Sequence, residues 1–227
     1  MTTILITGAN RGIGLAMARH AADRGMTVIG TAREPGKADE LKAVASRVEE
    51  LHTDSADSVG ALAKKLGDEP IDILVNNAGI FLHECDEIEK LDEDAFMRSI
   101  RVNTLGPLLL TRALVTNLAA SDRKIVAQIT SNLGSITDAS KGQMGFLGYR
   151  TSKAALNMVN ATIAHQLKPK GITCIAIHPG WVKTDMGGKG ADLTPDKSAA
   201  SIMDTIEGVK PAQSGSFVNY AGEPMPW

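Results

Sequence analysis

The fold is decided by the stretch Thr7-Gly8-Ala9-Asn10-Arg11-Gly12-Ile13-Gly14. It joins a short apolar run to an amphipathic segment, and its glycines have the spacing Gly-x-x-x-Gly-x-Gly. We expect Gly8 to allow a tight turn, Gly12 to let the backbone approach a pyrophosphate, and Gly14 to let a helix pack closely on a sheet. The start of that helix would offer free N–H groups and a positive dipole end to phosphates. A plain strand–turn–helix junction would also use glycines, so the turn needs support from the rest of the chain.

That support is an alternation of short β-branched runs with longer amphipathic segments. We expect strands at Thr3–Thr7, Thr27–Thr31, Val48–Thr53, Ile71–Asn76, Lys124–Thr130, Ile172–His178 and Gly215–Val218. We expect helices at Ile13–Arg24, Ala38–Ser46, Ser55–Leu66, Asp92–Ala119, Tyr149–Leu167 and Pro195–Ile206. Helical connections between strands imply parallel pairing. The predicted fold class is α/β: one domain over residues 1–227, with a doubly wound, Rossmann-like parallel sheet of about seven strands and helices on both faces.

Composition excludes several classes of protein. The 227 residues are 43% hydrophobic and 22% charged, with a formal net charge of −2, which gives no basic surface for a nucleic acid. The apolar runs are too short to span a membrane, and the start of the chain lacks the pattern of a signal peptide. Cys85 and Cys174 lie far apart, so we expect no structural disulfide and a cytoplasmic setting. His83 and Cys85 alone fall short of a metal site, so we expect no metal.

The residues after the second expected strand bear on the choice of cofactor. A dinucleotide site that prefers NAD usually carries an acidic residue about 20 positions after the glycines, where it binds the ribose 2′-hydroxyl. Here Thr31-Ala32-Arg33 stands at that place. Arg33, with Arg11 in the glycine-rich turn, could hold a 2′-phosphate, which predicts NADP(H). The alternative is that both arginines are solvated surface charges.

Candidate catalytic residues follow later in the chain. Tyr149 and Lys153 are four residues apart and would share one face of a helix. An ammonium beside the phenol would lower the pKa of Tyr149 from its usual value near 10. Asn76-Asn77-Ala78-Gly79, Ser131 and Pro179-Gly180 each follow an expected strand, and Asn103 lies in the long helix expected at 92–119. These positions would face the crevice at the carboxyl ends of the strands.

In this combination the chain resembles the short-chain dehydrogenase/reductase family from Thr3 to about Val218. The matching elements are Thr7–Gly14, Asp54, Asn76–Gly79, Asn103, Ser131, Tyr149–Lys153 and Pro179–Thr184. Within the family, the segments 149–153 and 178–188 and the closing Pro226-Trp227 resemble the C-factor-like and Sniffer-like carbonyl reductases.

The resemblance implies a role for each matching residue. Tyr149 would exchange a proton with a carbonyl or alcohol oxygen, and Ser131 would orient that oxygen. Lys153 would lower the pKa of Tyr149 and bind the nicotinamide ribose, and Asn103 would hold a water that links Lys153 to solvent. The other implied cofactor contacts are Gly8, Asn10, Arg11, Gly12, Ile13, Gly14, Arg33, Asp54 at the adenine, Asn77 near its ribose, Ala78, Gly79, Thr184 at the carboxamide, and Pro179, Gly180 and Val182 within the pocket wall Ile177–Val182.

Three points stay open at this stage. The gap from Ser131 to Tyr149 is longer than is usual in the family, so Ser135 is the runner-up for the catalytic hydroxyl, with Thr130 and Ser140 as further rivals. Trp181 could line the substrate pocket or be structural. The function expected is NADP(H)-dependent hydride transfer to and from a small carbonyl or alcohol substrate, and the alternative is a dinucleotide-binding sensor or signalling protein. We expect no nucleic-acid or membrane partner, and exposed long helices could form a homodimer.

Overall fold

Short apolar segments form one parallel sheet in the computed structural model, which describes residues 1–85, 88–142 and 145–227. Its strands are β1 (Thr3–Ile6), β2 (Thr27–Ala32), β3 (Arg47–Glu50), β4 (Ile73–Asn76), β5 (Ile125–Ile129), β6 (Thr173–His178) and β7 (Phe217–Asn219). Within the described residues the sheet has seven strands in the order β3-β2-β1-β4-β5-β6-β7, and every pair is parallel. The predicted doubly wound α/β fold is therefore confirmed.

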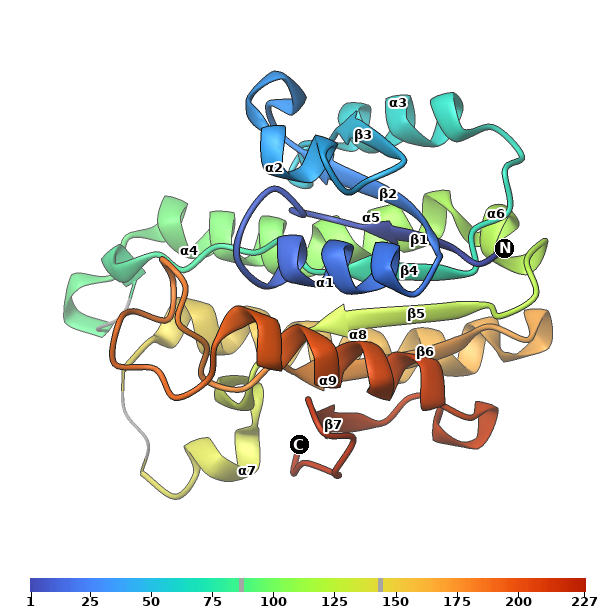
Figure 1. Cartoon of the computed structure of the whole chain (residues 1–227). Helices are drawn as coiled ribbons and strands as arrows, with labels where there is room; N and C mark the ends of the chain where they lie inside the picture. Colours follow the sequence, from blue (N-terminus) through green and yellow to red (C-terminus); the bar gives the residue numbers. More distant parts are fainter. Residues whose placement is uncertain (86–87, 143–144) are drawn as a thin grey trace.

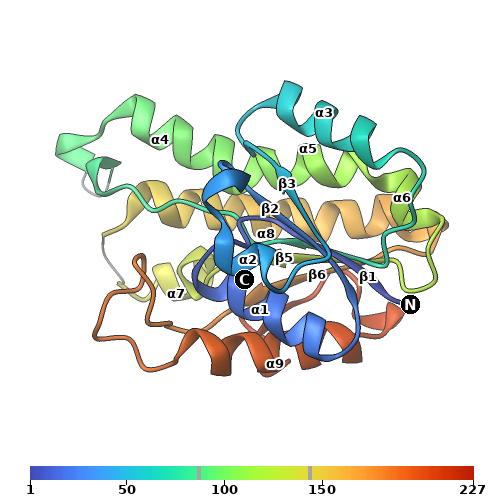
Figure 2. The same cartoon turned by 45° about the horizontal axis from the view of Figure 1, so that its top comes forward.

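Helices cover both faces of the sheet (Figures 1 and 2). One face carries α1 (Gly12–Asp23), the single turn α2 (Asp39–Lys42) and α9 (Pro195–Gly208). The other carries α3 (Ala56–Leu66), α5 (Gly106–Ala113), α6 (Val115–Ala119) and α8 (Leu147–Leu167), and α4 (Glu93–Ile100) packs beside α8. In the described part of the chain, no helix is both long and apolar enough to cross a lipid bilayer.

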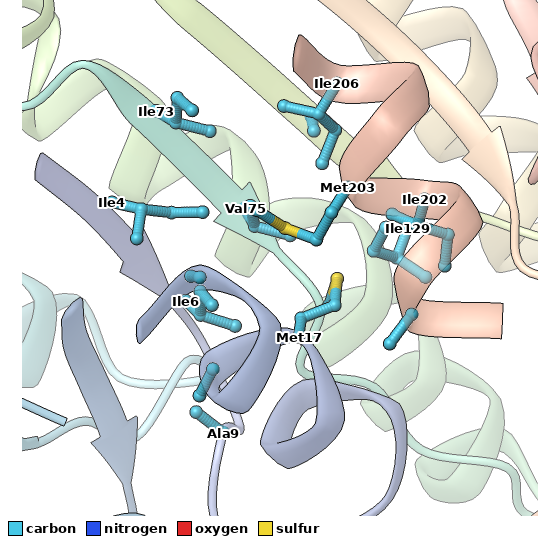
Figure 3. Packing of buried hydrophobic residues seen from close by; sticks show 14 of the residues in the cluster. Ile4, Ile6, Ala9, Met17, Ile73, Val75, Ile129, Ile202, Met203 and Ile206 are labelled. Carbon is cyan, nitrogen blue, oxygen red and sulfur yellow. The ribbon is translucent and has the colours of Figure 1, made fainter. Parts of the chain in front are cut away.

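The inner strands are mostly apolar on both faces because helices cover both faces of the sheet. In β1, Ile4 and Ile6 face α1 and α9, whereas Leu5 faces the helices of the other layer. Figure 3 shows Met17 of α1 and Met203 of α9 meeting over these strands. Cys174 belongs to the second layer and is a buried free thiol, while the side chain of Cys85 lies outside the described part of the structure.

The strand order reverses at β1 and β4, which are neighbours in the sheet. A crevice outside the carboxyl ends of such strands is where open α/β sheets bind ligands. The turns that follow β1 and β4 meet here: the Oγ1 of Thr7 accepts hydrogen bonds from the N–H groups of Asn77 and Ala78, both at 2.9 Å. The topology thus places the glycine-rich turn beside the Asn76–Gly79 segment.

Two of the helix predictions need correction. The helix predicted at Ala38–Ser46 forms only the turn α2, because the chain must turn back at once to enter β3. The helix predicted at Asp92–Ala119 is divided into α4, a π-helical turn at Arg101–Leu105, α5 and α6. The wide π turn buries three consecutive side chains, Val102, Asn103 and Thr104, which an ordinary amphipathic helix would not do.

Two of the segments for which the sequence predicts neither a strand nor a helix contain short helices. Residues 132–148 include a 3₁₀ turn at Asn132–Gly134 and α7 (Ile136–Ala139), and residues 78–91 include 3₁₀ turns at His83–Cys85 and Ile88–Lys90. Positions 86–87 and 143–144 of these segments lie outside the described residues.

Candidate active site

A cleft of about 660 Å³ opens at the carboxyl ends of β1 and β4. Most of the predicted cofactor residues line it: Gly8, Asn10, Arg11, Gly12, Ile13, Gly14, Arg33, Asp54, Asn77, Ala78, Gly79, Tyr149, Lys153, Pro179 and Thr184. Gly180 and Val182 are not among the lining residues. Val182 is buried and pairs with Leu193 in an isolated bridge, so the wall predicted at 177–182 reaches the cleft through Pro179.

The first turn requires glycine at three positions, for different geometric reasons. Gly8 and Gly12 have φ angles of +61° and +56°, which side chains rarely adopt. A Cβ on Gly14 would lie 2.5 Å from both Nδ2 of Asn77 and the carbonyl oxygen of Gly8. Gly14 therefore makes room for the turns at the ends of β1 and β4. The sequence predicts a different role, which is close packing of the helix on the sheet.

Asn77 ties these two turns together. Its Nδ2 donates to the carbonyl oxygen of Thr7 at 2.8 Å and to that of Gly8 at 3.3 Å. The resemblance had implied a contact of Asn77 with the ribose next to the adenine. The residue does line the cleft, but its amide nitrogen is engaged in holding the glycine-rich turn.

The corner of the cleft at the end of β2 is rich in cations. Arg33 is exposed on its wall, together with Glu34 and Lys37, which form an ion pair. The hydrogen bond from Lys37, the charge of Lys37 and the charge of Arg33 hold the pKa of Glu34 below its usual value. Lys37 was not predicted, although it stands only four positions after Arg33. Arg11 forms an ion pair with Asp185, which links the turn after β1 to the segment after β6.

Tyr149 lies in the first turns of α8 with its side chain almost completely buried. Burial raises its pKa to about 12, and a hydrogen bond with the side chain of Ser131 lowers it by a smaller amount. The prediction of a lowered pKa is therefore wrong for this structure. Removing the phenolate from water outweighs the stabilisation that its neighbours offer, so the phenol keeps its proton at neutral pH.

Lys153 lies one helical turn after Tyr149, and its Nζ is 5.7 Å from the centre of the tyrosine ring. The ammonium donates to the carbonyl oxygen of Ile129, at the end of β5, at 2.9 Å. Burial lowers the pKa of Lys153 to about 8, so the group is mostly charged at neutral pH. The bond to Ile129 holds the ammonium of Lys153 at the end of β5, where both residues line the cleft together with Tyr149.

Among the rival hydroxyls, Ser131 is the one beside Tyr149. Its Oγ also accepts from the N–H of Leu133 at 3.1 Å, which fixes it at the end of β5. Ser135 is engaged elsewhere, since it caps α7 and donates to the main-chain oxygen of Trp227. Thr130 donates to Oδ1 of Asn157 at 2.7 Å, and Ser140 donates to the carbonyl oxygen of Thr137 at 2.8 Å.

Asn103 lies in the π-helical turn, and both polar atoms of its side chain have partners within the protein. Its Oδ1 accepts from the N–H of Ile80 at 2.8 Å, and its Nδ2 donates to the carbonyl oxygen of Ile80 at 2.9 Å and to Oγ of Ser152 at 3.0 Å. The next residue, Thr104, donates to the carbonyl oxygen of Ser152 at 2.8 Å. The turn thus joins the strand end at 76–80 to the helix that carries Tyr149 and Lys153.

Two aromatic residues near Tyr149 were not predicted. The ring centre of Phe81 lies 5.0 Å from that of Tyr149 and 5.1 Å from that of Phe146. Neither position has a sequence signal, because the loops that carry them have no periodicity. Like these two residues, Trp181 is not among the residues that line the cleft; it is 55% exposed, and its indole donates to the carbonyl oxygen of Gly187 at 2.8 Å.

His178 is the last residue of the strand predicted at Ile172–His178, and it packs at the end of that strand in the structure. It ends β6 and is mostly buried, and burial lowers its pKa to about 4. The imidazole is neutral at physiological pH, and its buried Nδ1 has no hydrogen-bond partner among the described residues.

Comparison with known proteins supports the same family. The sequence model of the family described as short chain dehydrogenase matches residues 2–192. The chain is 39% identical to C-signal of Myxococcus xanthus over 158 residues, which are 70% of this chain and 93% of that protein. Among solved structures, the carbonyl reductase Sniffer of D. melanogaster has a TM-score of 0.91 and 33% identity, with 100% of both chains covered.

A second solved structure, the NADPH-bound carbonyl reductase from chicken fatty liver, also has a TM-score of 0.91. It is 32% identical and covers 100% of this chain and 99% of that chain. The family match spans most of the sequence, and the two structures match the fold along its whole length. The chain therefore belongs to the short-chain dehydrogenase family, in the subgroup that includes C-signal and the Sniffer carbonyl reductase.

Proposed function

We propose that the protein is an NADP(H)-dependent oxidoreductase that transfers a hydride between the nicotinamide and a carbonyl or alcohol substrate, with Tyr149 as the acid/base. The observation that carries this proposal is the placement of Tyr149 on the wall of the cleft, hydrogen-bonded to Ser131 and with a pKa of about 12. A phenol that keeps its proton at neutral pH is prepared to donate it to a carbonyl oxygen that is becoming an alkoxide.

The residues of the cleft fit a dinucleotide. Gly8 and Gly12 keep side chains out of the turn, and α1 begins at Gly12 with its N-terminus on the cleft, where a pyrophosphate is favoured. When bound, the cofactor would supply or accept the hydride. Arg33 and Lys37 at the end of β2 would bind a 2′-phosphate, and Ala32 offers no carboxylate to a 2′-hydroxyl. This arrangement favours NADP(H), the form bound by the chicken liver relative.

The other residues have supporting roles in the proposal. Ser131 would orient the substrate oxygen toward the phenol. Lys153, charged at neutral pH, would stabilise negative charge that develops on Tyr149 and would bind the nicotinamide ribose. Asn103 would connect this region to solvent through a water, as the family resemblance implies. The whole chain, residues 1–227, would act as one catalytic domain in the cytoplasm, on small molecules, and its exposed long helices could form a homodimer.

The second candidate is a signalling protein that binds a dinucleotide without turnover. It is favoured by the likeness to C-signal of M. xanthus. The proximity of Tyr149, Ser131 and Lys153 favours the enzyme, because a sensor would not need a buried proton donor on the wall of the cleft.

The two candidates are separated by mixing the purified protein with NADPH and a panel of aldehydes and ketones while the absorbance of NADPH is followed. Consumption of NADPH in proportion to alcohol formed is the expected result. Tight binding of NADPH, measured by calorimetry, with no turnover across the panel would favour the signalling protein. Consumption of NADH in strong preference to NADPH would contradict the cofactor assignment.

A further inference from the structure

We propose that Phe81 determines the substrate specificity of this site, that Phe146 supports it, and that Asn103 holds it in position. The inference rests on the proposed function and adds a chemical preference: the group attached to the reacting carbonyl is a flat, uncharged ring. Nothing about the proton donor or the cofactor cleft requires these aromatic residues, so they need an explanation of their own.

The first observation is the cluster of rings around the phenol. Phe81 meets Tyr149 at an interplanar angle of 69°, Phe146 at 60°, and His83 at 84°, with ring centres 4.7 to 5.1 Å apart. All three are edge-to-face contacts, the arrangement that aromatic pairs prefer. Phe81 directly follows Ile80, which lines the cleft, so the cluster begins where the cofactor wall ends.

The second observation is the way in which Phe81 is held. Asn103 binds both the N–H and the carbonyl oxygen of Ile80, at 2.8 and 2.9 Å, and so fixes the peptide that precedes the Phe81 backbone. A side chain that clamps both polar groups of one residue in this way sets the direction in which the chain leaves it. Asn103 is therefore a positioning residue for Phe81.

The third observation is the backbone of Phe146. Its φ angle is +58°, in the left-handed region that bulky side chains rarely adopt, and it directly precedes the start of α8 at Leu147. Strain of this kind persists where the surrounding structure imposes it, and it clusters at functional sites. The effect here is to bring the Phe146 ring, which is 37% exposed, against Phe81.

The rings of Phe81 and Phe146, here called the aromatic wall, determine which substrate group binds best beside Tyr149. Ring edges and faces offer dispersion and quadrupole contacts to another flat ring, whereas a puckered ring of the same size gains the dispersion without the edge-to-face contribution. A carboxylate placed against the rings of Phe81 and Phe146 would lose its hydration without gaining a hydrogen-bond donor from them. We therefore expect aryl aldehydes and ketones to be better substrates than alicyclic or anionic ones.

The test compares kcat/KM for benzaldehyde and cyclohexanecarbaldehyde with NADPH. One edge-to-face contact corresponds to a preference of about 2- to 12-fold for the aromatic substrate. Phe81→Leu should remove most of that preference, and Phe146→Leu should reduce it. Phe217→Leu is the matched control: it removes the same ring atoms from a buried position on β7, against Trp227, and should leave the ratio unchanged.

Asn103→Ala separates positioning from proton transfer. If Asn103 holds Phe81, the variant lowers the ratio of the two kcat/KM values toward that of Phe81→Leu. If Asn103 acts only through a water, both substrates slow by the same factor and the ratio stays at the wild-type value, which would overturn the positioning role. An unchanged ratio in Phe81→Leu would overturn the specificity role.

A binding experiment keeps the inference testable if the proposed function fails. Benzamide and cyclohexanecarboxamide carry the same two rings and are not reduced, so their dissociation constants can be measured by calorimetry on the NADPH-loaded protein. Tighter binding of benzamide, lost in Phe81→Leu, supports the aromatic wall even without turnover of any carbonyl. Equal affinity for the two amides, together with normal turnover of aldehydes, refutes the wall and leaves the proposed function intact.

Discussion

Gly14→Ala is expected to destabilise the protein, although alanine is the better helix former. Alanine in a helix is favoured over glycine by about 1 kcal/mol. At Gly14 the new Cβ would lie 2.5 Å from the carbonyl oxygen of Gly8, 2.5 Å from Nδ2 of Asn77 and 3.1 Å from Cα of Ala9. Two of these three atoms belong to the main chain, so they cannot move aside as the end of a flexible side chain can.

The magnitude follows from these contacts. Overpacking of this kind costs about 1–3 kcal/mol. Displacing the amide of Asn77 also weakens its hydrogen bonds to Thr7 and Gly8, which together contribute about 1 kcal/mol. After the helix-propensity gain is subtracted, a net loss of about 2 kcal/mol remains. For a chain of this size that loss lowers Tm by about 4–8 °C.

Gly60→Ala is the matched control. Gly60 is also a helical glycine, in the middle of α3, but a Cβ there would meet nothing within 4 Å. We expect this variant to gain up to about 1 kcal/mol and to raise Tm by about 2–4 °C. The assay is thermal unfolding of both variants without ligand, followed by titration with NADPH. Gly14→Ala should also bind NADPH more weakly, since the cleft wall must shift. Equal rises in Tm for the two variants would refute the reasoning.

Four further substitutions test the site. Tyr149→Phe should abolish nearly all turnover and leave the dissociation constant of NADPH almost unchanged, because only the proton donor is lost; near-normal kcat would contradict the mechanism. Arg33→Ala should weaken NADPH by about 10- to 150-fold and barely affect NADH, with Ala32→Asp weakening NADPH further, and equal losses for both cofactors would count against the 2′-phosphate contact. The free energies of unfolding of the wild type and of Lys153→Met, measured in urea, should differ by an amount that changes with pH. Lys153 titrates near pH 8 when folded and near 10.5 when unfolded, so the unfolded chain binds more protons between these values. Wild-type stability relative to the variant should therefore rise across that window by a few kcal/mol, and parallel curves would contradict the buried, lowered pKa.

The fold was predictable because its signals are local and repeated. Apolar runs such as Ile71–Val75 and the glycine spacing at 8–14 specify a parallel sheet and its first turn. The predicted first and last residues of the strands differ from the observed ones by up to three residues. The turn α2 and the π-helical turn at 101–105 were missed because tertiary packing, and not local periodicity, decides them.

The candidate site was predictable in position more than in detail. The hydroxyl next to Tyr149 is Ser131, the first choice over Ser135, because a residue directly after a strand is held rigidly by it. The direction of the Tyr149 pKa was wrong because a spacing of four residues shows that two side chains share a helix face, but not how deeply they are buried. Phe81 and Lys37 were missed because short loops give no period from which a side-chain direction can be inferred.

The π-helical turn has a consequence for insertions and deletions. Each residue of an ordinary helix advances about 100° around the axis, so losing one residue between 101 and 105 would rotate α5 against α4 by about that angle. The deletion would leave composition and helix propensity nearly unchanged. Two contacts now form together because the helix has one register here: Asn103 with Ile80, and Thr104 with Ser152. After the deletion the helix could no longer make both of them. In relatives of this chain, a gap of one residue at this place therefore marks a different link between the cleft and the helix that carries Tyr149, even where every side chain of the site is retained.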